Sequence, residues 1–291
     1  MSEEKLLARL AALAGNEDYL YYDAAGPAGL LINIDGYAAS SSKLPFMSWS
    51  DWAYKSVIAA ASDVIAAGGT PEAIAYSVGS PSADPLESIA RGVGEASSYL
   101  GAKVYKADAN RSSSDTWIDV TVVGTSSRPV SRAGAKAGDV LVQVGYLGYG
   151  AVAYKVLRGA LSLSDVPHEV LDLIVRPRIM KSAGTLISRV AHASSDNSDG
   201  WLTTIYNIAS ASRVLVSIDD MVLDPGVEGL INDEEAANSW EDYNIAVVVP
   251  PDLAEDFVRG CGTCFIVGKV KEGSGVELKG REAKPKGWSW W

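Results

Sequence analysis

Apolar residues recur along the chain in two alternating patterns. Short apolar runs bounded by Gly, Pro or Asp are typical of strands, and longer segments with apolar positions three and four apart are typical of helices. We expect helices at 3–14, 49–68, 85–101, 150–158, 165–176, 182–193 and 201–212, and strands at 18–23, 29–35, 73–79, 103–108, 116–124, 139–145, 213–219, 243–250 and 265–270. Ser50 is expected to cap the second helix. The alternation predicts an α/β (α+β) fold.

A polar, glycine-rich segment at 126–139 separates two halves of this pattern. Segments of this composition commonly link domains, because they carry few apolar side chains to bury. We therefore expect an N-terminal domain at 1–130 and a C-terminal domain at 131–291.

Charge narrows the possible partners. The chain carries 25 basic and 36 acidic residues, a net charge of −11, which argues against electrostatic binding of nucleic acid. An anionic substrate would be repelled unless cations intervene. The longest uncharged apolar run, 140–154, is too short to span a bilayer, and the charged start does not resemble a signal peptide. We expect a cytoplasmic protein without membrane partners.

Histidine and cysteine offer little to metal or nucleophilic chemistry. The only two histidines, His168 and His192, lie in contexts that support neither a zinc site nor a catalytic triad. Cys261 and Cys264 form a single CxxC pair, which cannot make a four-cysteine zinc site. Two buried thiols or a structural disulfide are both compatible with this spacing.

Acidic residues are concentrated where predicted strands end. Asp23, Asp35 and Asp108 each close an expected strand, and Asp196 and Asp199 lie in the polar stretch HASSDNSDGW. Asp63, on the 49–68 helix, is a further candidate. Carboxylates without basic neighbours suit Mg²⁺, which in turn bridges phosphates. Aspartates are also common in turns and caps, so a turn-forming role stays open for each of them.

Five motifs together resemble one family, thiamine-monophosphate kinase of the AIR-synthase-like (PurM-like) superfamily. The stretches SDVIAAGGTP, SRAGAKAGDVLVQVGYLG, SSDNSDGWL, WEDYNIAVVVP and ELKGREAKPKGWSWW resemble the family's SDxAAMGAxP, RSGAxxGDxxxVTGxLG, DISDGL, GEDYELxFxVP and GWDHF or GYDHF tail, in that order. The resemblance covers nearly the whole chain, and the DxSDG and EDY pair is its most specific part.

The resemblance implies a fold, an activity and a set of site residues. The fold would be a two-domain PurM-like one, with an N-terminal sheet forming a dimer barrel and a C-terminal α/β domain completing the site. The activity would be ATP- and Mg²⁺-dependent phosphorylation of thiamine monophosphate to the diphosphate by a homodimer. The implied contacts are Asp23, Asp35, Asp63, Asp108, Asp196 and Asp199 for metal, Asp108, Arg132 and Ser198 for ATP, and Glu241, Trp288 and Trp291 for the thiamine phosphate.

No general base is expected for this reaction. The acceptor is itself a phosphate with a second pKa of about 6, so at neutral pH it is largely a dianion ready to attack. The difficulty lies in bringing two polyanions together, which metal ions and cationic side chains achieve by positioning and charge neutralisation.

Several family positions differ in this chain. The family's GDDA reads Tyr21-Tyr22-Asp23-Ala24, its STD reads Asn33-Ile34-Asp35, and its GGDT reads Lys106-Ala107-Asp108-Ala109. The substrate-side histidine is absent near 40–43, and Tyr149 replaces the acid of LGD. These losses favour an alternative, a diverged nucleotide-binding or scaffold protein of the same fold. The retained aspartates, Arg132 and Glu241 favour the kinase.

Overall fold

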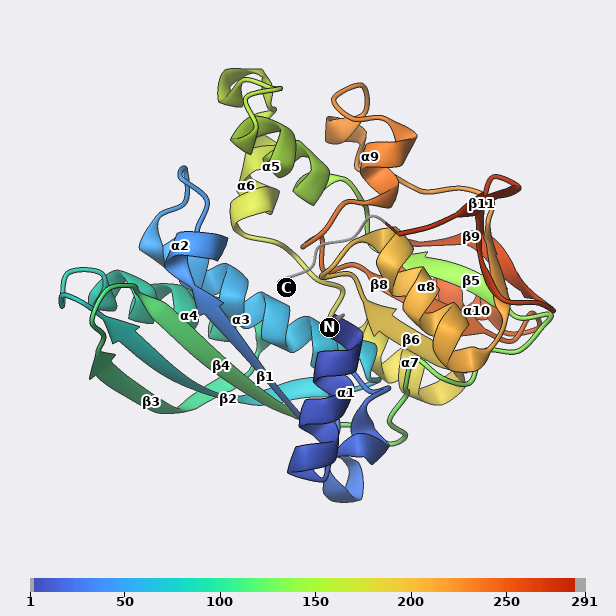
Figure 1. Cartoon of the computed structure of the whole chain (residues 1–291), viewed down its shortest axis with the longest axis horizontal. Coiled ribbons are helices and arrows are strands. Elements are labelled where there is room, and N and C mark those ends of the chain that lie inside the picture. Colours follow the sequence, from blue (N-terminus) through green and yellow to red (C-terminus); the bar gives the residue numbers. More distant parts are fainter. Residues whose placement is uncertain (1–2, 286–291) are drawn as a thin grey trace.

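The computed structural model describes residues 3–285, which build two β-sheets with helices around them (Figure 1). The N-terminal sheet has the strand order β1-β4-β2-β3. Its strands are β1 (Leu30–Ala38), β2 (Thr70–Ser80), β3 (Lys103–Arg111) and β4 (Trp117–Thr125). β4 runs antiparallel to both β1 and β2, and β2 and β3 are parallel. A crossover through α4 (Leu86–Leu100) joins that parallel pair, as parallel strands require.

Helix α3 (Trp49–Ala66) connects the N-terminal sheet to the rest of the molecule. It packs on β1 and β4 and also contacts α7 (Ala183–Val190) and β6 (Ala193–Asp196) of the C-terminal half. Its side chains are buried on almost every face, including those of Ser50, Lys55, Ser56 and Ser62. The N-cap is Ser48 rather than the expected Ser50, because Ser48 and Asp51 form a reciprocal capping box.

The C-terminal half is built on a seven-stranded sheet of order β11-β10-β7-β9-β5-β8-β6. Its remaining strands are β5 (Val140–Val144), β7 (Leu215–Ile218), β8 (Ile245–Val249), β9 (Cys264–Lys271), β10 (Gly275–Leu278) and β11 (Arg281–Ala283). The other described α-helices are α1 (Glu3–Ala14), α2 (Ala39–Ser42), α5 (Tyr149–Leu157), α6 (His168–Val175), α8 (Trp201–Ser212), α9 (Asp233–Ala237) and α10 (Ala254–Cys261). All neighbouring strands of this sheet are antiparallel except β7 and β10.

Two apolar cores lie on the two faces of the seven-stranded sheet. The first contains α3 and α4 with the inner face of the N-terminal sheet, and it continues onto α7, α10 and one face of β5 and β8. The second lies on the other face of the seven-stranded sheet, beneath α5, α6, α8 and α9. The first core is shared by both halves. Strand β6 contacts α3, and Ser62 of α3 donates to Asp196 at the end of β6.

Three sequence expectations were wrong in detail. Segment 18–23 is not a strand: a 3₁₀ turn covers Glu17–Tyr19, and most of its side chains are exposed, so no sheet face buries them. Asp35 and Asp108 lie inside β1 and β3 rather than at strand ends. The helix expected to reach 193 ends at Val190, and the unexpected strand β6 begins at Ala193.

The hydrophobic pattern did not predict β6, because three of its four residues are polar although buried: Ser194, Ser195 and Asp196. The 265–270 strand is not the last one either, since β10 and β11 follow it. The boundary at residue 130 stays a prediction.

The two histidines each contact an aspartate, and the two cysteines form a disulfide. His192 contacts Asp139 through Nδ1 at 2.9 Å, and His168 forms an exposed i,i+4 pair with Asp172. Cys261 and Cys264 are joined in a disulfide between the end of α10 and the start of β9. Among the helices that the structure describes, none is both long and apolar enough to cross a membrane.

Candidate active site

Three carboxylates from distant parts of the chain converge beside α3. One oxygen each of Asp23, Asp63 and Asp196 lie within 4.8 Å of one another. Asp23 comes from the loop before β1, Asp63 from the last turns of α3, and Asp196 from the end of β6. The packing of α3 against both halves therefore assembles a compact set of hard oxygen ligands.

Asp35 adds a fourth carboxylate to this group from β1. The side-chain amide of Asn33, two residues earlier on the same face of the strand, donates to Asp63 Oδ2 at 2.6 Å and lies 3.2 Å from Asp35 Oδ2. Asn33 occupies the position of the first hydroxyl in the family motif STD. An amide donor between the two carboxylates holds them together and relieves part of their repulsion.

Asp23 is held by groups from the C-terminal half. Arg132 Nε donates to its Oδ1 at 2.7 Å, the amide N–H of Asp196 donates to its Oδ2 at 3.1 Å, and Ser195 Oγ lies 3.2 Å from Oδ1. The Asp23 side chain is 1 % exposed. The attraction of Asp23 raises the pKa of Arg132 further above its ordinary value. This ion pair joins the N-terminal loop to the segment that follows β4.

The clustered carboxylates destabilise one another as anions. Burial, with repulsion from Asp196, Asp35 and Asp23, raises the pKa of Asp63 well above its usual range. Burial and the charge of Asp23 raise the pKa of Asp196 in the same way, against the opposing hydrogen bond from Ser62 Oγ at 2.7 Å. Burial likewise raises the pKa of Asp35. A bound cation would remove this repulsion, so the electrostatics favour cation binding.

The two most specific sequence motifs are hydrogen-bonded to each other. The backbone N–H of Glu241 donates to Ser198 O, and that of Tyr243 donates to Asn197 O. Asn197, fully buried, also donates from Nδ2 to the side chain of Asn244 at 2.9 Å. The segments SSDNSDG and WEDYN thus form one unit, which presents Ser198, Asp199 and Glu241 to the same space.

Glu241 is held in a strained conformation at this junction. Its φ is +53° and that of Tyr243 is +52°, values in the left-handed region that cost energy for residues other than glycine. Its carboxylate pairs with Lys55 of α3 at 2.5 Å, where the lysine side chain is 8 % exposed. Strain of this kind persists only when surrounding contacts enforce it, and here it aims Glu241 into the cavity.

Asp242, between these two strained residues, anchors the start of α5. Its carboxylate accepts from the backbone N–H of Gly148 at 2.9 Å and of Gly150 at 2.8 Å. Burial nevertheless raises its pKa to about 6. This contact fixes α5 beside the EDY segment.

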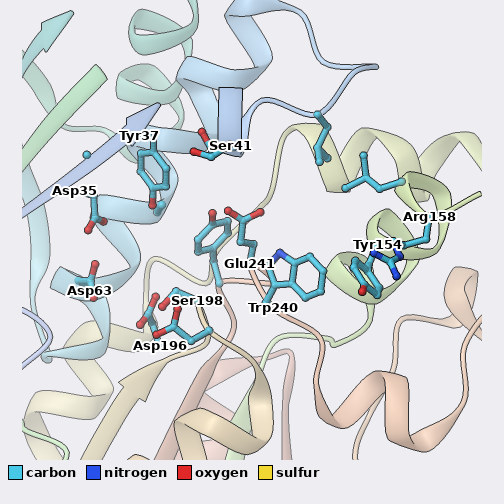
Figure 2. A pocket seen from close by; sticks show the side chains of 17 residues that line it. Asp35, Tyr37, Ser41, Asp63, Tyr154, Arg158, Asp196, Ser198, Trp240 and Glu241 are labelled. Carbon is cyan, nitrogen blue, oxygen red and sulfur yellow. The ribbon is translucent and has the colours of Figure 1, made fainter. Parts of the chain in front are cut away.

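A cavity of about 460 Å³ opens from the carboxylates. Figure 2 shows Asp35, Asp63 and Asp196 at one end, Glu241 in the middle and Trp240, Tyr154 and Arg158 at the other end. Tyr37 and Tyr243 also line this cavity. The cavity therefore changes from strongly acidic to aromatic along its length.

The structure brings together most of the predicted site residues. Asp35, Asp63, Asp196, Ser198, Asp199 and Glu241 line the cavity, and Asp23 and Arg132 lie behind the carboxylate cluster. Trp288 and Trp291 lie outside the described residues.

Asp108 does not join this group within one chain. It is exposed on β3, at the opposite edge of the sheet from Asp35 on β1, three strand spacings or about 14 Å away. The ladder pairs it with Ser77 and Asp119, whereas Asp35 aligns with Val120 and Tyr76, so the two aspartates are on opposite faces. Within a single chain, Asp108 therefore lies apart from the other predicted metal ligands, and its metal and ATP contacts stay a prediction.

Sequence reasoning missed several residues that shape the site. They are Asn33, Lys55, Ser62, Tyr154, Ser195 and Trp240. Ser62 directly precedes Asp63 and Ser195 directly precedes Asp196, a signal that could have found them. Lys55, by contrast, lies 186 residues from Glu241, and only the fold brings the two together.

Comparison with known proteins agrees with this geometry. The sequence model described as AIR synthase related protein, N-terminal domain, matches residues 16–126, and that of the C-terminal domain matches residues 136–281. The curated thiamine-monophosphate kinase of Pyrococcus abyssi is 30 % identical over 258 residues, covering 86 % of this chain and 81 % of the relative. That of Pyrobaculum calidifontis is 29 % identical over 281 residues, covering 94 % and 89 %.

Solved structures share the fold over the full length. A structure described as AaThiL complexed with AMPPCP and TMP has a TM-score of 0.89 at 24 % identity, covering all of this chain and 97 % of that one. The protein tt0281 of Thermus thermophilus has a TM-score of 0.86 at 26 % identity, with 97 % and 98 % covered. The chain is thus an AIR synthase-related protein with the two-domain α/β fold of that class. Within the class, it belongs to the thiamine-monophosphate kinase family.

Proposed function

We propose that this protein transfers the γ-phosphate of ATP to thiamine monophosphate and so produces thiamine diphosphate. The observation that carries the proposal is the convergence of Asp23, Asp63 and Asp196 at the acidic end of a cavity that also presents Glu241. The relatives that the chain matches over most of its length are named for this activity, and one related structure is described as a complex with AMPPCP and TMP.

The donor set fits Mg²⁺. Asp23, Asp63 and Asp196 provide carboxylate oxygens at close range, and Asp35 and Asp199 line the same cavity as Asp63 and Asp196. When bound, Mg²⁺ would neutralise phosphate charge and so lower the repulsion between the two substrates. Asn33, Ser62 and Ser195 hold the carboxylate oxygens in place through the contacts described above.

The chain's own residues supply position and charge rather than a base. Ser198, whose carbonyl oxygen accepts from the Glu241 backbone N–H, is the proposed hydroxyl donor to a phosphate oxygen of ATP. Arg132 uses Nε for Asp23, and its guanidinium has further N–H donors that suit a nucleotide phosphate. The acceptor phosphate attacks as a dianion, as argued above, so no side chain has to remove a proton.

Glu241 is the proposed contact for the positive thiazolium ring of the acceptor. Its partner Lys55 lies on α3, and the Glu241 side chain is 23 % exposed and lines the cavity. An anion in that position attracts a permanent cation and repels a second phosphate. Trp288 and Trp291 remain proposed as further thiamine contacts.

A homodimer is the proposed assembly. The outer face of the N-terminal sheet exposes Leu30, Ile32 and Ile34 on the edge strand β1, and Tyr105 is exposed on the opposite edge strand β3. Exposed apolar side chains of this kind favour association with another protein surface. Asp108 lies on that same outer face, so its proposed ATP and metal contacts would be made to the site of a second subunit.

ATP as phosphate donor makes the cytoplasm the proposed location.

The decisive experiment uses the purified full chain with ATP, Mg²⁺ and thiamine monophosphate. We expect thiamine diphosphate and ADP in equal amounts, and none when Mg²⁺ is omitted. The departures at Tyr22, Asn33 and Lys106 motivate the alternative of a diverged, non-catalytic nucleotide-binding protein. Binding of ATP by calorimetry without any diphosphate formed would support that alternative and overturn the kinase.

A further inference from the structure

The cavity has an aromatic end that none of the residue assignments above explains. Trp240 and Tyr154 meet there edge to face, with ring centroids 5.0 Å apart and planes at 70°. The guanidinium of Arg158 lies 5.6 Å from the centroid of the Tyr154 ring. All three side chains line the same cavity as Asp63 and Asp196 (Figure 2).

Local structure explains why these rings meet. Gly150 lies in the first turn of α5, where a Cβ would overlap the carbonyl oxygen of Trp240, so only glycine lets the helix approach so closely. Tyr154 is four residues later and therefore on the same face of α5. Trp240 occupies the position that is glycine in the family motif GEDY, so the wall is a feature of this chain rather than of the motif.

The order of chemical groups along the cavity matches the order of groups along thiamine monophosphate. That molecule carries a phosphate, then a thiazolium cation, then a neutral aromatic aminopyrimidine. The cavity offers the metal-binding carboxylates, then Glu241, then the aromatic pair. Arg158 at the far end repels the thiazolium and so favours the orientation that leaves the neutral ring there.

We infer that Trp240 and Tyr154 form the subsite for the aminopyrimidine ring of the acceptor and determine specificity for it. The inference rests on the proposed function, whose acceptor it describes in more detail. Aromatic rings bind such a heterocycle by stacking or edge contact, with a preference for aromatic over aliphatic walls. The two residues are specificity determinants rather than catalytic residues, because the phosphates react at the opposite end of the cavity.

The test measures equilibrium binding of two acceptors in the presence of Mg²⁺ by calorimetry. One acceptor is thiamine monophosphate, and the other is an N-methylthiazolium with the same phosphoethyl arm but no pyrimidine. Trp240→Ala is expected to raise the Kd for thiamine monophosphate roughly 3- to 30-fold and to leave the Kd of the truncated acceptor within about 2-fold. Trp240→Phe should lie between Ala and the wild type, since it keeps a ring.

Tyr154→Leu should show the same selective loss, and Tyr206→Leu is its matched control. Tyr154 and Tyr206 are each 41 % exposed, but Tyr206 lies on α8 away from the cavity. Equal weakening of both acceptors, or no change in either, would overturn the subsite. Because binding is measured directly, a wild type that binds thiamine monophosphate without phosphorylating it would contradict the kinase and leave the subsite supported.

Discussion

At the scale of single residues, the site is a collection of carboxylates held close against their mutual repulsion. The sequence identified Asp23, Asp35, Asp63 and Asp196 as candidates through the motifs around them, and all four converge. It could not identify Asn33 or Lys55 as their partners, because such pairings depend on tertiary distances. The same limit explains Asp108, whose motif suggested the cluster although the register of β3 turns its side chain to the other face.

Replacing Asp63 by asparagine should lower turnover without lowering the melting temperature. A neutral amide cannot hold Mg²⁺ between phosphates, so turnover should fall below about one hundredth of the wild type. Removing one charge from the cluster relieves repulsion, so the metal-free variant should melt at the same temperature or higher. Calorimetry measures the melting temperature, and a coupled ADP assay measures turnover.

The matched control is Asp252→Asn, an exposed aspartate outside the cavity, which should change neither quantity. Turnover of Asp63→Asn within a few-fold of the wild type would contradict the metal assignment.

Asp242 gives a stability prediction that depends on pH. Its pKa is raised to about 6 in the folded protein, so the folded state holds a proton that the unfolded chain releases near pH 4. Its stabilising contribution is therefore complete below pH ~4 and is lost as the pH rises through ~6, by up to about 3 kcal/mol.

Chemical denaturation of the wild type and Asp242→Asn between pH 4 and pH 7.5 isolates this effect. Asparagine loses one acceptor for the Gly148 and Gly150 amides, which lowers stability at every pH. The difference in unfolding free energy should shrink as the pH rises towards 7. A difference that stays constant would show that Asp242 does not titrate in this range.

At the scale of elements, the hydrophobic pattern predicted most helices and strands, because α3, α4, α8, β4 and β8 have long or regular apolar runs. It failed where burial and polarity do not coincide. β6 is buried but consists of Ala-Ser-Ser-Asp, and the segment 18–23 contains three tyrosines but finds no strand partner. This polar strand carries Asp196 of the site. Departures from the hydrophobic pattern of this kind are expected at functional sites.

The contact between α3 and α4 makes an element-scale prediction. Gly92 faces Ser50 so closely that a Cβ would overlap the Ser50 carbonyl oxygen, whereas Gly94 on the same helix has no atom within 4 Å of such a Cβ. Gly92→Ala should lower the unfolding free energy by about 1–3 kcal/mol. Gly94→Ala should be neutral or stabilise by up to about 1 kcal/mol, because alanine favours the helix. Equal effects of the two substitutions in denaturant melts would contradict the close packing.

At the scale of the whole molecule, α3 joins the two sheets and contributes site residues that pair with both halves. It contributes Asp63 to the carboxylates and Lys55 to Glu241, and its core extends into both halves. The family resemblance anticipated two domains and a shared site. It could not anticipate the aromatic wall of Trp240 and Tyr154, because that wall depends on the approach of α5 at Gly150.

The outer face of the N-terminal sheet carries the last prediction, that the chain is a dimer in solution. Ile34 is 64 % exposed and Tyr105 is 70 % exposed, on opposite edge strands of the sheet. Exposed apolar side chains on edge strands invite pairing with another sheet, and burying them in a second copy would remove that liability.

Light scattering at micromolar concentration should therefore give twice the chain mass. Ile34→Asp should shift the protein towards the monomer, because a carboxylate facing its copy across an apolar interface is left buried and unpaired. Leu13→Asp, at an exposed leucine on α1 rather than on this sheet, is the control and should remain dimeric. If Asp108 acts on the site of a second subunit, the Ile34→Asp monomer should also lose ATP turnover. A monomeric wild type with full activity would overturn both the assembly and the role of Asp108.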